Sequence, residues 1–225
     1  MIVITGISGG IGRKLAIELS NHDNIIGIYN SNKVFFQEKN IVTKQLDLNN
    51  EQGIVNFVKD GALTRVTIIH LATVSIDGLI ANYPRSDWDQ TININITGNY
   101  LITKHLLPLM INEKWGRIIH FSSIVAKKGE KGAVAYGMSK NAIIGFSRGL
   151  SQEYGRFNIT SNVLNLGYME TGLIDTLSKE KKKEIIRKIP VNKFGNINSV
   201  VNAIKFIIDS DYVNGSEISI DGGFR

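Results

Sequence analysis

The chain has 225 residues, enough for the core of one α/β domain, and 43% of them are hydrophobic and 20% charged. It has no cysteine, which excludes disulfides, thiolate zinc sites and cysteine nucleophiles, and its net charge of +6 indicates a solvated lysine-rich surface or an acidic partner. No signal peptide and no apolar run of the roughly 20 residues needed to span a bilayer is recognisable, so we expect a cytoplasmic protein without a membrane partner.

Short β-rich runs alternate with helical patterns along the chain. Strands are predicted at Ile2–Thr5, Ile25–Tyr29, Ile41–Leu46, Val66–Leu71, Arg117–Phe121, Ile159–Leu164 and Glu217–Ile220. Helices are predicted at Ile11–Ser20, Glu51–Lys59, Trp88–Ile111, Val134–Tyr154 and Ile197–Ile208. Lys179–Lys188 mixes glutamates with lysines, which indicates an exposed helix rather than a nucleic-acid site. The alternation predicts a single Rossmann-like domain over residues 1–225, a doubly wound parallel sheet of about seven strands with helices on both faces.

A glycine-rich turn joins the first predicted strand to the first predicted helix, in the stretch VITGISGGIGRKLA. Its glycines are Gly6, Gly10 and Gly12, with Gly9 as an extra one. Glycines at such a junction let backbone N–H groups approach a pyrophosphate at the helix N-terminus. A tight connection without a ligand is the alternative, but the position of the turn favours a dinucleotide site.

The second predicted strand ends in GIYNSNK and carries no acid that could hold the ribose of NAD. Asn30, Ser31 or Asn32 could hydrogen-bond a 2′-phosphate, and Lys33 could offset its charge. This pattern favours NADPH over NADH, with an ordinary polar turn as the alternative.

Six motifs, in this order, resemble the short-chain dehydrogenase/reductase family over essentially the whole chain. They are TGISGGIG (Thr5–Gly12), Asp47 in QLDLNN, Asn95 in ININITG, Ser123 in IIHFSSIVA, YGMSK (Tyr136–Lys140) and GSEISIDGG (Gly215–Gly223). The resemblance implies catalytic roles for Asn95, Ser123, Tyr136 and Lys140. It implies cofactor contacts at Gly6, Ser8, Gly9, Gly10, Ile11, Gly12, Asn30, Ser31, Asn32, Asp47, Leu48, Ala72, Thr73, Tyr136, Lys140, Gly167, Met169 and Thr171, and no metal.

The chemistry expected of these residues is the reduction of a ketone by hydride, which needs a proton for the forming alkoxide. Tyr136 would donate it, and Lys140, four positions later on one helical face, would lower the pKa of Tyr136. Ser123 would hydrogen-bond the substrate oxygen. By family analogy, Asn95 would hold a water that links Lys140 to solvent. Taken singly, each residue could instead be a turn serine, a helix-interior polar residue or a packed aromatic.

Two stretches depart from the family pattern. HLAT (His70–Thr73) replaces N-N-A-G and keeps only Ala72, so this segment is held differently. His70 could be a catalytic base, but at the end of a buried strand a core histidine is favoured. NLGYMET (Asn165–Thr171) lacks the proline that the family usually has before Gly167, which removes some rigidity.

The stretch from Met110 to Leu150 is most similar to the 3-oxoacyl-acyl-carrier-protein reductase branch. This likeness indicates a 3-oxoacyl thioester and an acidic acyl carrier protein, which Lys114 and Arg156 could meet. Thr171–Lys188 would form a flexible flap, where Leu173, Ile174 and Leu177 indicate an apolar pocket. A reductase or dehydrogenase of a sugar or another small ketone or alcohol, and a non-catalytic dinucleotide-binding regulator, are the alternatives.

The helix that carries Tyr136 also has Ala142, Gly145 and Gly149 on one side. An interior helix glycine costs about 1 kcal/mol relative to alanine, which close approach of a second helix would offset. This spacing, together with the family resemblance, favours a homodimer or homotetramer. Tight packing on the chain's own sheet is the alternative.

Overall fold

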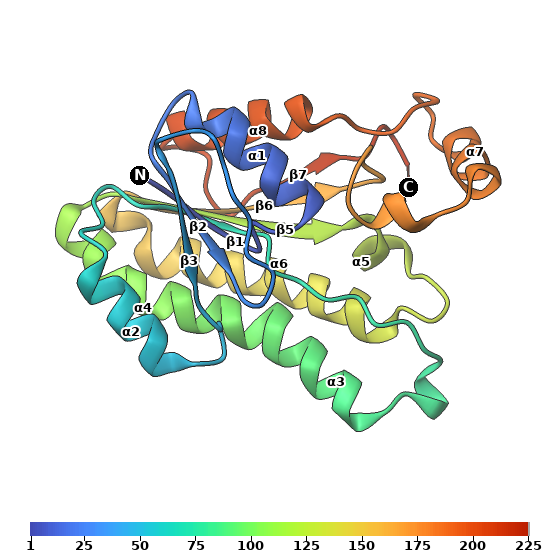
Figure 1. Cartoon of the computed structure of the whole chain (residues 1–225), viewed down its shortest axis with the longest axis horizontal. Helices are drawn as coiled ribbons and strands as arrows, with labels where there is room; N and C mark the ends of the chain where they lie inside the picture. The colour runs from blue at the N-terminus through green and yellow to red at the C-terminus, as the bar shows by residue number, and fades with distance from the viewer. Residues whose placement is uncertain (225) are drawn as a thin grey trace.

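The computed structural model describes residues 1–224, with all side chains in that range except those of Leu173 and Thr176. Its strands form one parallel sheet in the order β3-β2-β1-β4-β5-β6-β7, which confirms the predicted fold class (Figure 1). The strands are β1 (Ile2–Thr5), β2 (Ile25–Tyr29), β3 (Ile41–Gln45), β4 (Thr67–His70), β5 (Gly116–Ser123), β6 (Ile159–Leu166) and β7 (Glu217–Ile220).

Helices cover both faces of the sheet. They are α1 (Gly10–Ser20), α2 (Glu51–Asp60), α3 (Arg85–Ile92), α4 (Gly98–Glu113), α5 (Ile124–Lys128), α6 (Val134–Tyr154), α7 (Lys179–Lys188) and α8 (Ile197–Asp209). In Figure 1, α1 and α8 lie above the sheet, and α2, α4 and α6 lie below it. No helix among the residues described is long and apolar enough to cross a bilayer.

Alternate residues of the central strands enter two separate core layers. Val3 and Ile118 pack in the layer of α2, α4 and α6, whereas Ile4 and Ile119 pack in the layer of α1 and α8, and all four are fully buried. Burial on both faces explains why these strands are nearly continuous apolar runs.

The predicted helix Trp88–Ile111 is not continuous. The chain forms α3, then a π-helical turn at Asn93–Thr97, then α4. The wide turn lies where Asn95 is completely buried and bonded to the segment after β4, a tertiary contact that the helical pattern cannot indicate. The prediction also missed α5, which is too short to show a period.

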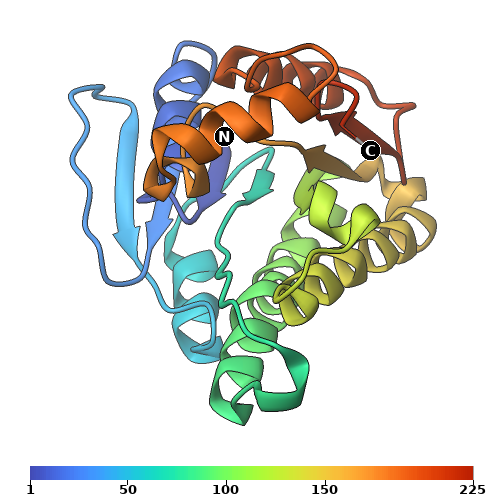
Figure 2. The same ribbon diagram turned by 90° about the vertical axis from the view of Figure 1, so that its right-hand side faces the viewer.

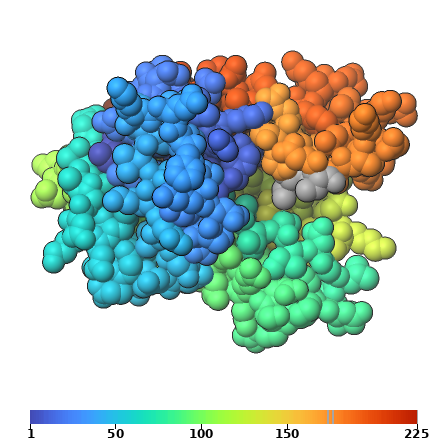
Figure 3. Space-filling view, in the orientation of Figure 1, coloured from blue at the N-terminus to red at the C-terminus, as the bar shows by residue number. Residues whose placement is uncertain are grey.

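All strands run in the same direction, so their carboxyl ends meet at one edge of the sheet. The strand order reverses at β1, whose neighbours are β2 and β4, and ligands of open α/β sheets bind outside such a switch point. This edge lies at the right of Figure 1, with α5 and α7 beside it, and faces the viewer in Figure 2. In the space-filling view, α7 projects at the upper right and α3 at the lower right (Figure 3).

Candidate active site

A cavity of about 870 Å³ lies at the carboxyl edge of the sheet. Every residue predicted to contact the cofactor lines it, and so does Ser123. Asn95 is the one predicted site residue that is not among the lining residues. The sequence motifs therefore converge on one cavity whose size is typical of ligand pockets, about 300–1,000 Å³.

The glycine-rich turn brings backbone groups into close contact. Gly6 has φ +70°, and a Cβ there would lie 2.7 Å from the Cα of Ala72. A Cβ on Gly12 would lie 2.6 Å from the carbonyl oxygen of Gly6. The helix α1 begins at Gly10 with no side-chain cap and no acid in its first turn. Its free N–H groups thus fit an anionic pyrophosphate.

Polar side chains border the cavity at the end of β2. Asn30, Ser31 and Asn32 are exposed and line it, and no carboxylate lies among them. Lys33 does not line the cavity, and its ammonium lies 5.0 Å from the ring centroid of Phe35. The polar trio, rather than Lys33, is therefore in position for a ribose or a 2′-phosphate.

Two polar side chains hold the unusual HLAT segment. The hydroxyl oxygen of Thr5 accepts hydrogen bonds from the backbone N–H groups of Leu71 and Ala72, both at 3.1 Å. The Asn95 side chain accepts from Val74 N at 2.8 Å and donates to Val74 O at 2.9 Å. These bonds fix the segment although N-N-A-G is missing.

The Asn95 amide uses its full hydrogen-bonding capacity within the chain. Besides its two bonds to Val74, it accepts from Thr73 Oγ1 at 3.1 Å and donates to Ser139 Oγ at 3.0 Å. Its backbone carbonyl accepts from Asn99 Nδ2 at 2.6 Å. The side chain therefore has no donor or acceptor left for the expected water, and Asn95 connects the β4 segment to the helix of Tyr136.

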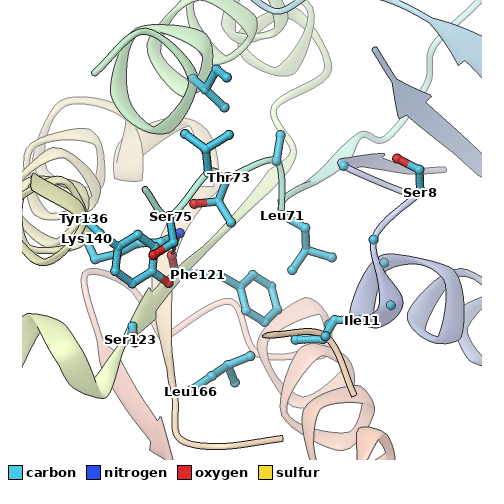
Figure 4. A pocket seen from close by; sticks show the side chains of 18 of the residues that line it. Ser8, Ile11, Leu71, Thr73, Ser75, Phe121, Ser123, Tyr136, Lys140 and Leu166 are labelled. Carbon is cyan, nitrogen blue, oxygen red and sulfur yellow. Dashed lines mark hydrogen bonds between the residues drawn. The ribbon is translucent and has the colours of Figure 1, made fainter. Parts of the chain in front are cut away.

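In Figure 4, Tyr136, Lys140 and Ser123 lie at one side of the cavity, and the glycine-rich turn with Ser8 and Ile11 lies at the other. The apolar side chains of Leu71, Phe121 and Leu166 lie between them. Tyr136 and Lys140 come from α6, and Ser123 comes from the end of β5. Ser123 also caps α5, because its Oγ accepts from Val125 N at 3.2 Å. A hydroxyl, a phenol and an ammonium thus converge where parallel strands end.

The pKa of Tyr136 differs from the expectation. Burial raises the pKa of Tyr136, and the Ser123 hydroxyl only partly opposes this. The Lys140 ammonium donates to Phe121 O at 3.0 Å and lies 5.6 Å from the Tyr136 ring centroid. Burial also lowers the pKa of Lys140 to about 8. The expected lowering of the Tyr136 pKa by Lys140 is wrong here, because burial raises this pKa and the only opposing effect comes from the Ser123 hydroxyl.

His70 is a core histidine, as favoured, and does not line the cavity. Its ring stacks on His120, and its Nε2 lies 3.1 Å from Thr103 Oγ1. Burial lowers the pKa of His70 to about 3, which keeps it neutral. Sequence reasoning missed His120 and Ser139, because no local pattern distinguishes them from other strand and helix residues.

The missing proline before Gly167 is offset by backbone pairing. Gly167 N donates to Ile220 O at 3.0 Å, and Met169 forms a parallel bridge with Gly195. Farther along the flap, Ile174 is buried in a cluster with Ile124, Ile185, Ile189 and Phe224. The side chain of Leu173 lies outside the described part of the chain.

Lys114 and Arg156, which were expected to flank the catalytic elements and meet an acidic carrier, are not near the cavity. Lys114 and Arg156 precede β5 and β6, so they lie at the amino edge of the sheet, away from the cavity, and do not flank it. The lining beyond the predicted residues includes polar side chains that no motif marks. They are Ser75, Asp77, Gln90, Glu130, Tyr168 and Asp175.

Comparison with known proteins gives consistent matches. The family model described as short chain dehydrogenase matches residues 1–182. The 3-oxoacyl-acyl-carrier-protein reductase of Aquifex aeolicus is 30% identical over 99% of this chain and 86% of its own length. The solved structure of ElxO with NADP bound is 27% identical, with a TM-score of 0.88 over 99% of this chain and 97% of that one. A Brucella melitensis 3-oxoacyl-acyl-carrier-protein reductase has the same fold, with a TM-score of 0.89 over 99% and 90% of the two chains at 21% identity.

Proposed function

We propose that this chain, which belongs to the short-chain dehydrogenase family, reduces a ketone with NADPH. The family and its relatives show an NAD(P)-dependent oxidoreductase that acts on CH–OH or C=O groups. The favoured substrates of the proposed reaction are 3-oxoacyl thioesters. The observation that carries this proposal is the convergence of Ser123, Tyr136 and Lys140 in the cavity that the glycine-rich turn borders. We further propose that residues 1–225 work as a single domain.

In the proposed reaction, Tyr136 is the proton donor. Its raised pKa keeps the phenol protonated near neutral pH, so the proton is available when the alkoxide forms. The Ser123 hydroxyl hydrogen-bonds the substrate oxygen as negative charge develops there. Lys140, the one cation among the described lining residues, would balance the negative charge that proton transfer leaves at this side of the cavity. NADPH, when bound, supplies the hydride.

NADPH is the proposed cofactor because the end of β2 presents amides and a hydroxyl without a carboxylate. An acid there would repel a 2′-phosphate, whereas Asn30, Ser31 and Asn32 can donate hydrogen bonds to it. The ElxO neighbours with NADP and NADPH bound support this choice. NAD is the less favoured alternative.

The thioester substrate is proposed from the curated relatives, several of which are 3-oxoacyl-acyl-carrier-protein reductases. An acidic acyl carrier protein is then the proposed partner. Lysines that could meet it stand on α5 and α7, and Lys128 Nζ lies 3.8 Å from the lining residue Glu130. A polar ketone such as a keto sugar is the second candidate, because Ser75, Asp77 and Gln90 line the cavity.

We propose that the protein is a homodimer or homotetramer that buries the outer face of α4 and α6. A Cβ added to Gly145 or Gly149 would meet nothing within 4 Å among the described atoms, so these glycines are not packed on the chain's own sheet. Tyr100, Leu107 and Phe146 line the groove beside them. Light scattering should give a dimer or larger, and a monomer would contradict this proposal.

The proposed function is tested by NADPH oxidation with three substrate classes: 3-oxoacyl thioesters, keto sugars and simple ketones. The thioesters should give the highest kcat/KM. Preference for a keto sugar would replace the substrate class but keep the reductase. NADPH binding without turnover of any class would favour a dinucleotide-binding regulator instead.

A further inference from the structure

The flap turn after β6 lies directly on the glycine-rich turn. A Cβ added to Gly10 would lie 2.7 Å from Thr171 Oγ1 and 3.0 Å from Gly172 N. A Cβ added to Gly172 would contact the Ile11 side chain at 3.6 Å. The hydroxyl of Thr171 and the N–H of Gly172 therefore border the same space as the first residues of α1.

Both of these donors are already engaged by one carboxylate. Asp175 Oδ2 accepts from Gly172 N at 2.8 Å and from Thr171 Oγ1 at 3.3 Å. Asp175 itself is exposed and lines the cavity. The Asp175 carboxylate thus occupies a hydroxyl donor and an N–H donor that lie next to the pyrophosphate-binding turn.

The cavity has little positive charge to offset this carboxylate. Lys140 is the one cation among the described lining residues, and its ammonium is bonded to Phe121 O. A pyrophosphate would depend mainly on neutral N–H and O–H donors, including those at the start of α1. Occupied donors and a nearby like charge both weaken its binding.

We propose that Asp175 sets the cofactor affinity of this enzyme, because its carboxylate competes with the dinucleotide pyrophosphate for the Thr171 and Gly172 donors. Binding requires the carboxylate to leave these donors, so the affinity is reduced by the fraction of molecules in which they are occupied. This inference rests on the proposed function. It extends that function by naming a residue that opposes cofactor binding instead of contributing to it.

A purely structural role gives a different expectation. Asp175 belongs to the single helical turn at 173–176 and could serve only to cap it. Removal of a cap loosens a turn and would weaken ligand binding, whereas removal of a competitor strengthens it. The sign of the change in affinity therefore separates the two roles.

The experiment is a fluorescence titration of NADPH against the full-length wild-type protein and the variants Asp175→Asn and Asp175→Ala. Both variants should bind NADPH more tightly, with Kd lower by about tenfold. Adenosine 2′-monophosphate, which has no pyrophosphate, should bind all three proteins with the same Kd. Glu170→Gln is the matched control, because Glu170 is an exposed carboxylate directly before the flap, lies 3.7 Å from Lys14 Nζ and does not occupy these donors.

Unchanged or weaker NADPH binding in both Asp175 variants would overturn the inference. Equal tightening by Glu170→Gln would also overturn it, since general charge would then be the cause. These outcomes leave the proposed function intact as long as the wild-type protein binds and oxidises NADPH. A wild-type protein that does not bind NADPH would overturn both.

Discussion

The imidazole rings of His70 and His120 stack in the core with their centroids 4.6 Å apart and their planes at 4°. The two residues are register partners on β4 and β5, and both are buried. Nδ1 of His70 and both ring nitrogens of His120 have no hydrogen-bond partner among the described residues. Burial lowers the pKa of both rings, that of His70 to about 3.

This histidine pair predicts a loss of stability in mild acid. The pKa of His70 is about 3 when folded and about 6.5 when unfolded, so the unfolded chain binds more protons between these values. The free energy of unfolding should therefore be highest above pH 6.5 and fall as the pH drops, by about 2 kcal/mol at pH 5 from His70 alone. Urea unfolding at several pH values measures this free energy. In His120→Phe the free energy of unfolding should fall less steeply as the pH drops. The same fall in the variant and in the wild type would contradict a role of the histidine pair.

Asn95 should matter for stability as well as for activity. Asn95→Ala removes a completely buried amide and leaves the partly buried backbone of Val74 without its partners, which should lower the free energy of unfolding by about 2–4 kcal/mol. Asn93→Ala is the control, because Asn93 is an exposed residue of the same π-helical turn. Similar losses in the two variants, measured by urea unfolding, would show that the Val74 bonds are not the cause.

Gly6 and Gly9 should respond differently to alanine. Gly6→Ala forces a side chain into φ +70° and within 2.7 Å of Ala72 Cα, so we expect a loss of about 1–3 kcal/mol or more. Gly9 has φ −71°, and its nearest neighbour would be Gly6 O at 3.4 Å. Gly9→Ala should therefore unfold at nearly the wild-type urea concentration. Equal destabilisation would mean that the turn does not need its close backbone contacts.

The regular elements of the fold were predictable because local patterns specify them. β1, β2, β7 and α6 begin and end where the sequence predicts. β5 and β6 run past their predicted ends because they pair with each other through Ser123 and Leu166, and part of this extension is polar. An apolar run cannot indicate a ladder that continues through polar residues.

The motifs likewise predicted which residues line the cofactor cavity, but they could not indicate how these residues interact. The bonds of Asn95 to Val74 and Ser139 join positions far apart in sequence. The pKa of Tyr136 depends on burial, which the i, i+4 spacing to Lys140 does not reveal. The positions of Lys114 and Arg156 follow from strand direction, and only the assembled sheet shows that they face away from the cavity.

The central claim is that Tyr136 delivers the proton, and Tyr136→Phe tests it most directly. Tyr154→Phe, at the far end of the same helix, is the control. NADPH binding by fluorescence titration and turnover of a 3-oxoacyl thioester should be measured on both variants and on wild type. We predict that Tyr136→Phe binds NADPH as wild type does while kcat falls by about 100-fold or more, the contribution typical of general acid catalysis. A Tyr136→Phe variant with near-wild-type kcat would contradict the account.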